Sequence, residues 1–198
     1  MQKFSRYCAC VSLMILSAFS YAQEEEEYKI ADNILNETYQ VFIKSVGKNN
    51  VQAIKTAQLA WIRYKEKHCN VSYDAVSESS VSPQNIYSCL RVETELRLNE
   101  IKRIMKIKND PSEYERDGFY LILLENESAA DKTKFIIAIN SAIMEYGDAD
   151  WRKYVRATCA FSANYIDEDQ DVCEARLNFT YVIVNKDTKA TYPDESLK

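Results

Sequence analysis

Glycine, proline and histidine are scarce in this chain, which has three Gly, three Pro and one His among 198 residues. A mostly β protein needs many tight turns, and glycine and proline commonly form them, so their scarcity favours long helices. A single histidine, outside any H-x3-H or H-E-x-x-H spacing, offers no cluster of metal ligands. The sequence also lacks a glycine-rich phosphate loop and a G-x-S-x-G motif. We therefore expect an all-α protein with no catalytic residues, no metal and no cofactor.

Long apolar runs are also missing. The run from Cys10 to Ser20 is shorter than the roughly 20 residues that span a bilayer. With Lys3 and Arg6 before it and Ser20-Tyr21-Ala22 after it, this run predicts a cleavable signal peptide over residues 1–22, cut after Ala22. The other apolar run, 119–124, has only six residues and fits either a buried helical turn or a strand. We expect an exported mature protein that is not attached to a membrane.

An excess of positive charge is absent as well. Removing Lys3 and Arg6 from the 25 basic side chains leaves 23 against 30 acidic ones, a mature net charge of −7. Nucleic acids and anionic membranes bind basic surfaces, so both are unexpected partners. The charge is compatible with a cationic protein partner, although a mildly acidic surface is also ordinary for a soluble protein.

A Trp-Tyr-Cys spacing, W-x2-Y-x4-C, occurs twice, and the second copy lies 90 positions after the first. The copies are Trp61, Tyr64 and Cys69, then Trp151, Tyr154 and Cys159, and each is followed by one more cysteine, Cys89 or Cys173. Four cysteines in an exported chain predict a disulfide framework with three possible connectivities. The repeat selects one bridge per copy, Cys69–Cys89 and Cys159–Cys173. A four-cysteine zinc site would need closely spaced ligand pairs, and the mature chain has no C-x2–4-C pair.

Apolar residues recur at helical spacing through most of the chain, for example at Leu35, Tyr39 and Phe42. The motif helix is expected to run from about residue 51 to Cys69, with a polar loop after it. Asn109-Asp110-Pro111-Ser112 is the clearest breaker and marks the boundary between units. We predict two tandem disulfide-stapled helical units that form helix bundles, at 23–109 and, as a degenerate copy, at 110–185. A loose tail is expected at 186–198.

Three patterns could carry enzyme chemistry, and each has a structural interpretation that we prefer. His68 beside Cys69 could act as base and nucleophile, but neighbours on a helix point about 100° apart and Cys69 has its own disulfide partner. Glu93 with Glu95 could act as a glycosidase carboxylate pair, but we expect an exposed helix face. Trp61 and Trp151 could stack on sugars, but their repeated helical position indicates core residues. A hydrolase would need a cleft with a shielded carboxylate.

Residues from about Tyr28 to Met105 contain a pattern of three segments. These are Leu35-Asn36-Glu37-Thr38-Tyr39, then Ala57-Gln58-Leu59-Ala60-Trp61-Ile62-Arg63-Tyr64-Lys65 through Cys69, then Cys89-Leu90 with Thr94 and Arg97. The pattern resembles the bacterial LprI-like family, known from the N-terminal domain of a lysozyme inhibitor. Lys65 stands where arginine is common, and Ser77-Glu78-Ser79-Ser80 replaces a glycine-rich loop segment. The second copy keeps its Trp, Tyr and cysteines but lacks the glutamine.

The resemblance implies a small helical protein of the bacterial periplasm or exterior that binds another protein and is not an enzyme. It gives Gln58, Trp61 and Tyr64, with Trp151 and Tyr154 in the second copy, as the family-motif core. The specific hypothesis is inhibition of a lysozyme-type muramidase by blocking its cleft, with acidic inter-cysteine loops facing a cationic lysozyme. The partner-binding candidates are Tyr73, Asp74 and Glu78 in the first loop, and Asp167, Glu168, Asp169 and Asp171 in the second. The alternative is an envelope-maintenance or structural adaptor of the periplasm without an enzyme target.

Overall fold

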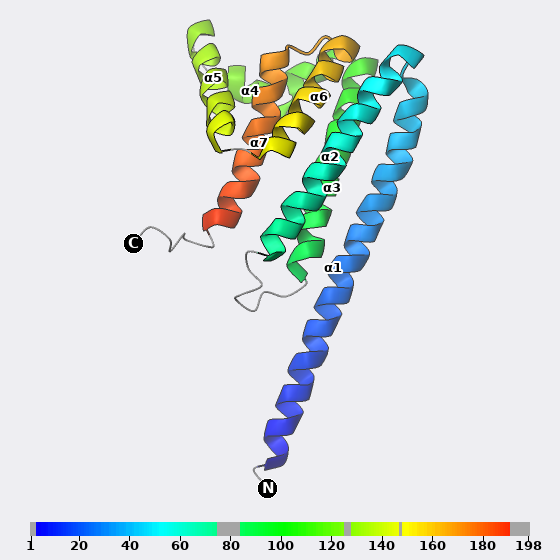
Figure 1. The fold of residues 1–198 in the computed structure, drawn as a ribbon, viewed down its shortest axis with the longest axis vertical. Helices are drawn as coiled ribbons and strands as arrows, with labels where there is room; N and C mark the ends of the chain where they lie inside the picture. The colour runs from blue at the N-terminus through cyan, green and yellow to red at the C-terminus, as the bar shows by residue number, and fades with distance from the viewer. Residues whose placement is uncertain (1–2, 75–83, 125–127, 147, 191–198) are drawn as a thin grey trace. The chain divides into compact units, whose positions relative to one another are not determined.

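The computed structural model describes residues 3–74, 84–124, 128–146 and 148–190, and every regular element in these ranges is helical (Figure 1). The elements are α1 (Lys3–Ser45), α2 (Lys48–Asp74), α3 (Gln84–Asn109), the 3-10 helix η2 (Pro111–Arg116), α4 (Gly118–Leu124), α5 (Ala129–Tyr146), α6 (Ala149–Ile166) and α7 (Gln170–Ala190). The predicted all-α class is confirmed.

The chain divides into two compact units that share helices α2 and α3. Unit 1 comprises Met1–Ser45 and Ile62–Lys102, and unit 2 comprises Val46–Trp61 and Arg103–Lys198. This grouping follows contacts in space, so the boundaries expected along the chain at 109 and 185 stay predictions. Helix α1 continues through the expected cleavage point between Ala22 and Gln23, and the signal peptide stays a prediction too. Among the described helices, none combines the length and apolar character that crossing a bilayer requires.

In unit 1, helices α1, α2 and α3 bury the faces that their apolar spacing predicted. Leu35 and Phe42 of α1, Tyr64 of α2 and Ile101 of α3 are all at most 1% exposed. Helix α2 is longer than expected, since it continues past Cys69 to Asp74. The expected end at the cysteine was wrong because the chain has no glycine or proline from residue 70 until Pro83 that would stop the helix.

In unit 2, the ambiguous run 119–124 is helical, as part of α4. Phe119 is buried and its ring lies against Phe135 of α5 and Phe179 of α7, with centroid distances of 6.3 and 5.7 Å. The expected breaker before it becomes η2, because the Asp110 side chain accepts a 3.0 Å hydrogen bond from the Ser112 amide and Pro111 occupies the first helical position. Helix α7 extends to Ala190, so the first part of the segment 186–198, expected to be loose, is helical.

Both predicted disulfides are present. Cys69–Cys89 joins α2 to α3 with Cα atoms 5.7 Å apart, and Cys159–Cys173 joins α6 to α7 with Cα atoms 5.6 Å apart. The family-motif residues are buried, which fits a core role: Gln58 7%, Trp61 3%, Tyr64 1%, Trp151 4% and Tyr154 3% exposed. The indole N–H of Trp151 donates a 2.9 Å hydrogen bond to the Asn178 side chain, which satisfies its polar atom inside the core.

Candidate partner-binding site

The turn between α6 and α7 carries the acidic residues expected in the second inter-cysteine loop. Helix α6 ends at Ile166, where Asp167 adopts a left-handed conformation with φ of 56°, and α7 begins at Gln170. Asp167, Asp169 and Asp171 are exposed. This short acidic turn, together with Asp171 in the first turn of α7, therefore presents three carboxylates to solvent.

Glu168, in the same turn, points the other way. Its side chain is fully buried, and both of its oxygens accept hydrogen bonds from the Arg103 guanidinium, at 2.7 and 3.2 Å. Arg176 Nε donates a further hydrogen bond to Glu168 Oε1 at 3.2 Å. Such two-pronged, charge-assisted contacts are the strong class of hydrogen bond. Glu168 was expected to contact a partner, but its burial instead makes it the internal anchor of the turn.

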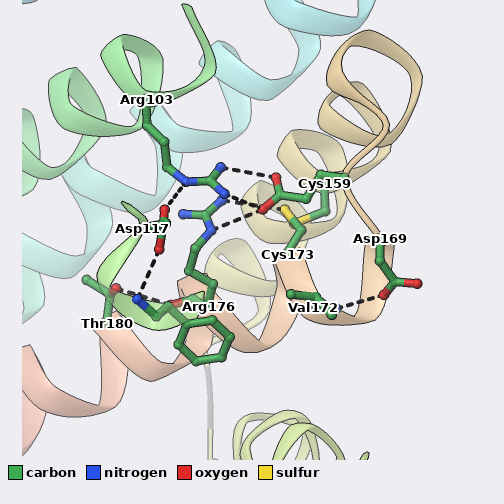
Figure 2. Close-up of polar contacts among 10 residues, drawn as sticks. Arg103, Asp117, Cys159, Asp169, Val172, Cys173, Arg176 and Thr180 are labelled. Carbon is green, nitrogen blue, oxygen red and sulfur yellow. Dashed lines mark hydrogen bonds and ion pairs between the residues drawn. A yellow bond between two sulfur atoms is a disulfide. The ribbon is translucent and has the colours of Figure 1, made fainter. Parts of the chain in front are cut away.

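Arg103 connects this anchor to the segment that follows α3. Its Nε donates to the Asp117 carboxylate at the end of η2, and its guanidinium carbon lies 5.5 Å from the centre of the Tyr114 ring. Burial, with the nearby negative charge of Glu168, raises the pKa of the Tyr114 hydroxyl. Figure 2 shows the Arg103 and Arg176 guanidinium groups close together, between Asp117 and the Cys159–Cys173 disulfide. One arginine from α3 thus holds two separate turns of unit 2.

The α7 side of the turn is fixed as well. The Asp169 carboxylate accepts a 3.0 Å hydrogen bond from the Val172 amide, and its carbonyl accepts one from the Cys173 amide at 2.9 Å. Arg176 Nη2 donates a hydrogen bond to the Cys173 sulfur, at a distance of 3.8 Å. The turn is held by an ion-pair anchor, a helix cap and a disulfide, which together fix the course of its backbone. The Asp169 carboxylate caps the N-terminus of α7 and is therefore already engaged in a hydrogen bond. Asp167 and Asp171 are the better candidates for contact with a partner.

The candidates of the first inter-cysteine loop begin in the last turn of α2. Tyr73 and Asp74 lie in the last turn of α2, where the backbone alone is described, and Glu78 lies outside the described residues. Their role as partner contacts stays a prediction.

A buried polar cluster in unit 1 was missed by the sequence analysis. Glu93 of α3 is 3% exposed, the Tyr64 hydroxyl donates to its Oε1 at 3.0 Å, and His68 Nε2 lies 3.7 Å from the same oxygen. Burial raises the pKa of Glu93 to about 7, against the opposing effects of the Tyr64 hydrogen bond and the Lys65 charge. The expected exposed face is correct for Glu95, whose side chain is 47% exposed, and wrong for Glu93. One feature of the sequence could have indicated that Glu93 is buried. Glu93 lies one helical turn after Cys89, so it shares the face of α3 that carries the disulfide.

Among the described residues, no group of three or more His, Cys, Asp or Glu side chains is arranged to hold a metal ion. His68, the only histidine, is stacked on the Tyr64 ring with centroids 5.2 Å apart. Cys69 is bonded to Cys89, so the two members of the suspected His–Cys pair serve separate packing roles.

Comparison with known proteins finds similarity over one segment of the chain. Residues 19–101 match the model of the family described as lysozyme inhibitor LprI. An uncharacterised protein of Rhizobium meliloti (strain 1021) is 26% identical over 95 residues, which cover 41% of this chain and 68% of that protein. No solved structure matches the chain. The resemblance to the LprI lysozyme inhibitor family is therefore confirmed over residues 19–101, the segment that contains the first Trp-Tyr-Cys copy and its disulfide partner.

Proposed function

We propose that this protein is an exported helical module that binds another protein, and that it inhibits a lysozyme-type muramidase by blocking its cleft. The observation that carries the proposal is the match of residues 19–101 to the LprI lysozyme inhibitor family. The two disulfides support export, because such bonds persist in oxidising compartments such as the periplasm. A protein recovered from the periplasm with Gln23 as its first residue would support the predicted signal peptide, whereas an uncleaved Met1 would contradict it.

The α6–α7 turn is the proposed contact with a cationic enzyme. A turn held in one conformation loses less conformational entropy on binding, so more of its interaction energy is available as affinity. Exposed carboxylates that face a cationic surface also speed the encounter, and this effect weakens as salt is added. Asp167 in this turn and Asp171 at the start of α7 are the proposed contacts, and Tyr73, Asp74 and Glu78 are those of the first inter-cysteine loop.

A turbidity assay of cell-wall lysis tests inhibition directly. Purified mature protein, in large molar excess, is expected to slow lysis by at least one of the c-type, g-type and i-type lysozymes. Unchanged lysis with all three would contradict the proposal and favour the adaptor alternative.

A charge-matched pair of variants tests the contact surface. The double variant Asp167→Asn/Asp171→Asn is expected to slow association with the lysozyme, most strongly at low salt. The control Glu37→Gln/Glu66→Gln removes the same charge from exposed positions in unit 1. If both double variants slow association equally, net charge alone is responsible and the α6–α7 turn is not the contact.

A further inference from the structure

The buried cluster around Glu93 lies between two helices of unit 1. Helix α2 contributes Tyr64 and His68, and α3 contributes Glu93, whose Oε1 is 3.0 Å from the Tyr64 hydroxyl and 3.7 Å from His68 Nε2. Tyr64 is 1% exposed, and the His68 side chain is 22% exposed. A carboxyl group so deeply buried is stable as the neutral acid, and its ionised form loses most of its hydration.

The other charged groups around Glu93 only partly offset this cost. Lys65 of α2 favours the ionised carboxylate, but its Nζ also lies 3.7 Å from Asp32 Oδ1 and 3.4 Å from the Tyr28 hydroxyl, both on α1. Burial lowers the pKa of Lys65 itself, so the interior disfavours its charge as well. Arg97, one turn further along α3, is fully buried. Burial of Glu93 outweighs the contacts that favour its ionised form, because the carboxylate loses its hydration and the pKa of Glu93 rises to about 7.

The cluster also lies beside the Cys69–Cys89 disulfide. His68 directly precedes Cys69, Tyr64 is about one turn before it, and Glu93 is one turn after Cys89. Residues one turn apart on a helix share a face, so the cluster and the disulfide hold the same stretch of the α2–α3 pair. We propose that Tyr64, His68 and Glu93 form a proton-controlled lock between α2 and α3, which is closed while Glu93 carries a proton and loosens when that proton leaves.

The direction of this linkage follows from two proton affinities. In the closed form burial raises the pKa of Glu93 to about 7, and once the helices separate the carboxyl meets water and returns to its ordinary value of 4.5. Between these values the closed form binds more protons than the open form, so opening becomes easier as pH rises. For one group with these two pKa values, the open fraction increases about 40-fold from pH 5 to pH 7.

Reduction of the two disulfides provides an internal comparison. Cys69, Cys159 and Cys173 are at most 1% exposed, whereas Cys89 is half-buried, so opening of unit 1 adds to the partial access that a phosphine reductant already has to the Cys69–Cys89 bond. We expect the reduction rate of Cys69–Cys89, divided by that of Cys159–Cys173, to rise from pH 5 to pH 7, by up to about 40-fold. Mass spectrometry of alkylated cysteines gives both rates from one sample, so any pH dependence of the reagent itself cancels.

Two variants separate the lock from a general charge effect. Glu93→Gln removes the titrating group and is expected to make the rate ratio independent of pH, whereas Glu95→Gln, on the same helix but more exposed, is expected to keep the wild-type dependence. A wild-type ratio that stays constant from pH 5 to pH 7 would overturn the proposal. So would an undiminished pH dependence in Glu93→Gln.

A second measurement needs no variant. Carbon-13 NMR of the Glu93 side-chain carboxyl in the intact protein should give a titration midpoint near the value of about 7 expected from burial. A midpoint near 4.5, the ordinary value, would overturn the lock even if Glu93→Gln does not fold.

Discussion

Removing Arg103 should destabilise unit 2 more than any surface substitution. Arg103→Gln leaves the fully buried Glu168 with Arg176 alone and takes the ion-pair partner from Asp117, whose side chain is 12% exposed. Removing one partner of a buried ion pair typically costs about 3–5 kcal/mol, because the remaining charge stays buried without compensation. The total stability of a domain is about 5–15 kcal/mol, so this is a large share.

Thermal unfolding followed by circular dichroism measures the effect. For a protein of this size, a loss of about 3–5 kcal/mol lowers the melting temperature by about 6–20 °C. Arg103→Lys should fall between wild type and Arg103→Gln, because lysine keeps the charge but cannot make the two-pronged contact with Glu168.

The matched control is Arg116→Gln. Arg116 pairs with Glu113 at 2.7 Å, but its side chain is 65% exposed, and pairs of this kind contribute at most about 1 kcal/mol. If Arg103→Gln and Arg116→Gln lower the melting temperature by the same small amount, Arg103 is not the anchor of the α6–α7 turn.

Three further predictions concern stability. The free energy of unfolding, measured in urea, should fall by up to about 3 kcal/mol from pH 4.5 to pH 7, because Glu93 binds its proton more tightly in the native protein than in the unfolded chain. Glu93→Gln should remove this loss, and a wild-type free energy of unfolding that rises with pH would contradict the prediction. Replacing Cys159 and Cys173 together by alanine should cost about 3 kcal/mol in the same assay, and an unchanged midpoint would show that the disulfide adds nothing to the helix packing. Thr158→Val should cost less than about 0.5 kcal/mol or stabilise the protein, because its buried hydroxyl has no hydrogen-bond partner among the described residues; a large loss would reveal a partner.

Features encoded by local spacing were predicted well from the sequence. The disulfide pairs follow from a spacing motif that occurs twice, 90 positions apart, and the buried Trp61 and Trp151 follow from that motif and from helical periodicity. The type of the 119–124 run could not be settled in this way, because a six-residue apolar segment fits a buried helix or strand equally well. Packing against α5 and α7 accompanies its helical form in the structure.

The buried carboxylates were not predictable from their local sequence. Glu168 lies in a run of acidic residues that resembles a solvated loop, and its main partner, Arg103, is 65 positions away. Glu93 differs from its exposed neighbour Glu95 only in the helix face that it occupies, and its hydrogen-bond donor Tyr64 is 29 positions away. Burial of a charged group depends on such distant partners, which no periodicity within one helix reveals.

The proposal that most needs a direct test is that this protein, which resembles the LprI family over residues 19–101, inhibits a lysozyme-type muramidase. The most direct measurement is the lysis rate of a cell-wall suspension with each of the three lysozyme types, in the presence of a large molar excess of the mature protein. We expect slower lysis with at least one type, and recovery of the rate when salt weakens the charge attraction. Lysis rates that are unchanged for all three types would contradict it.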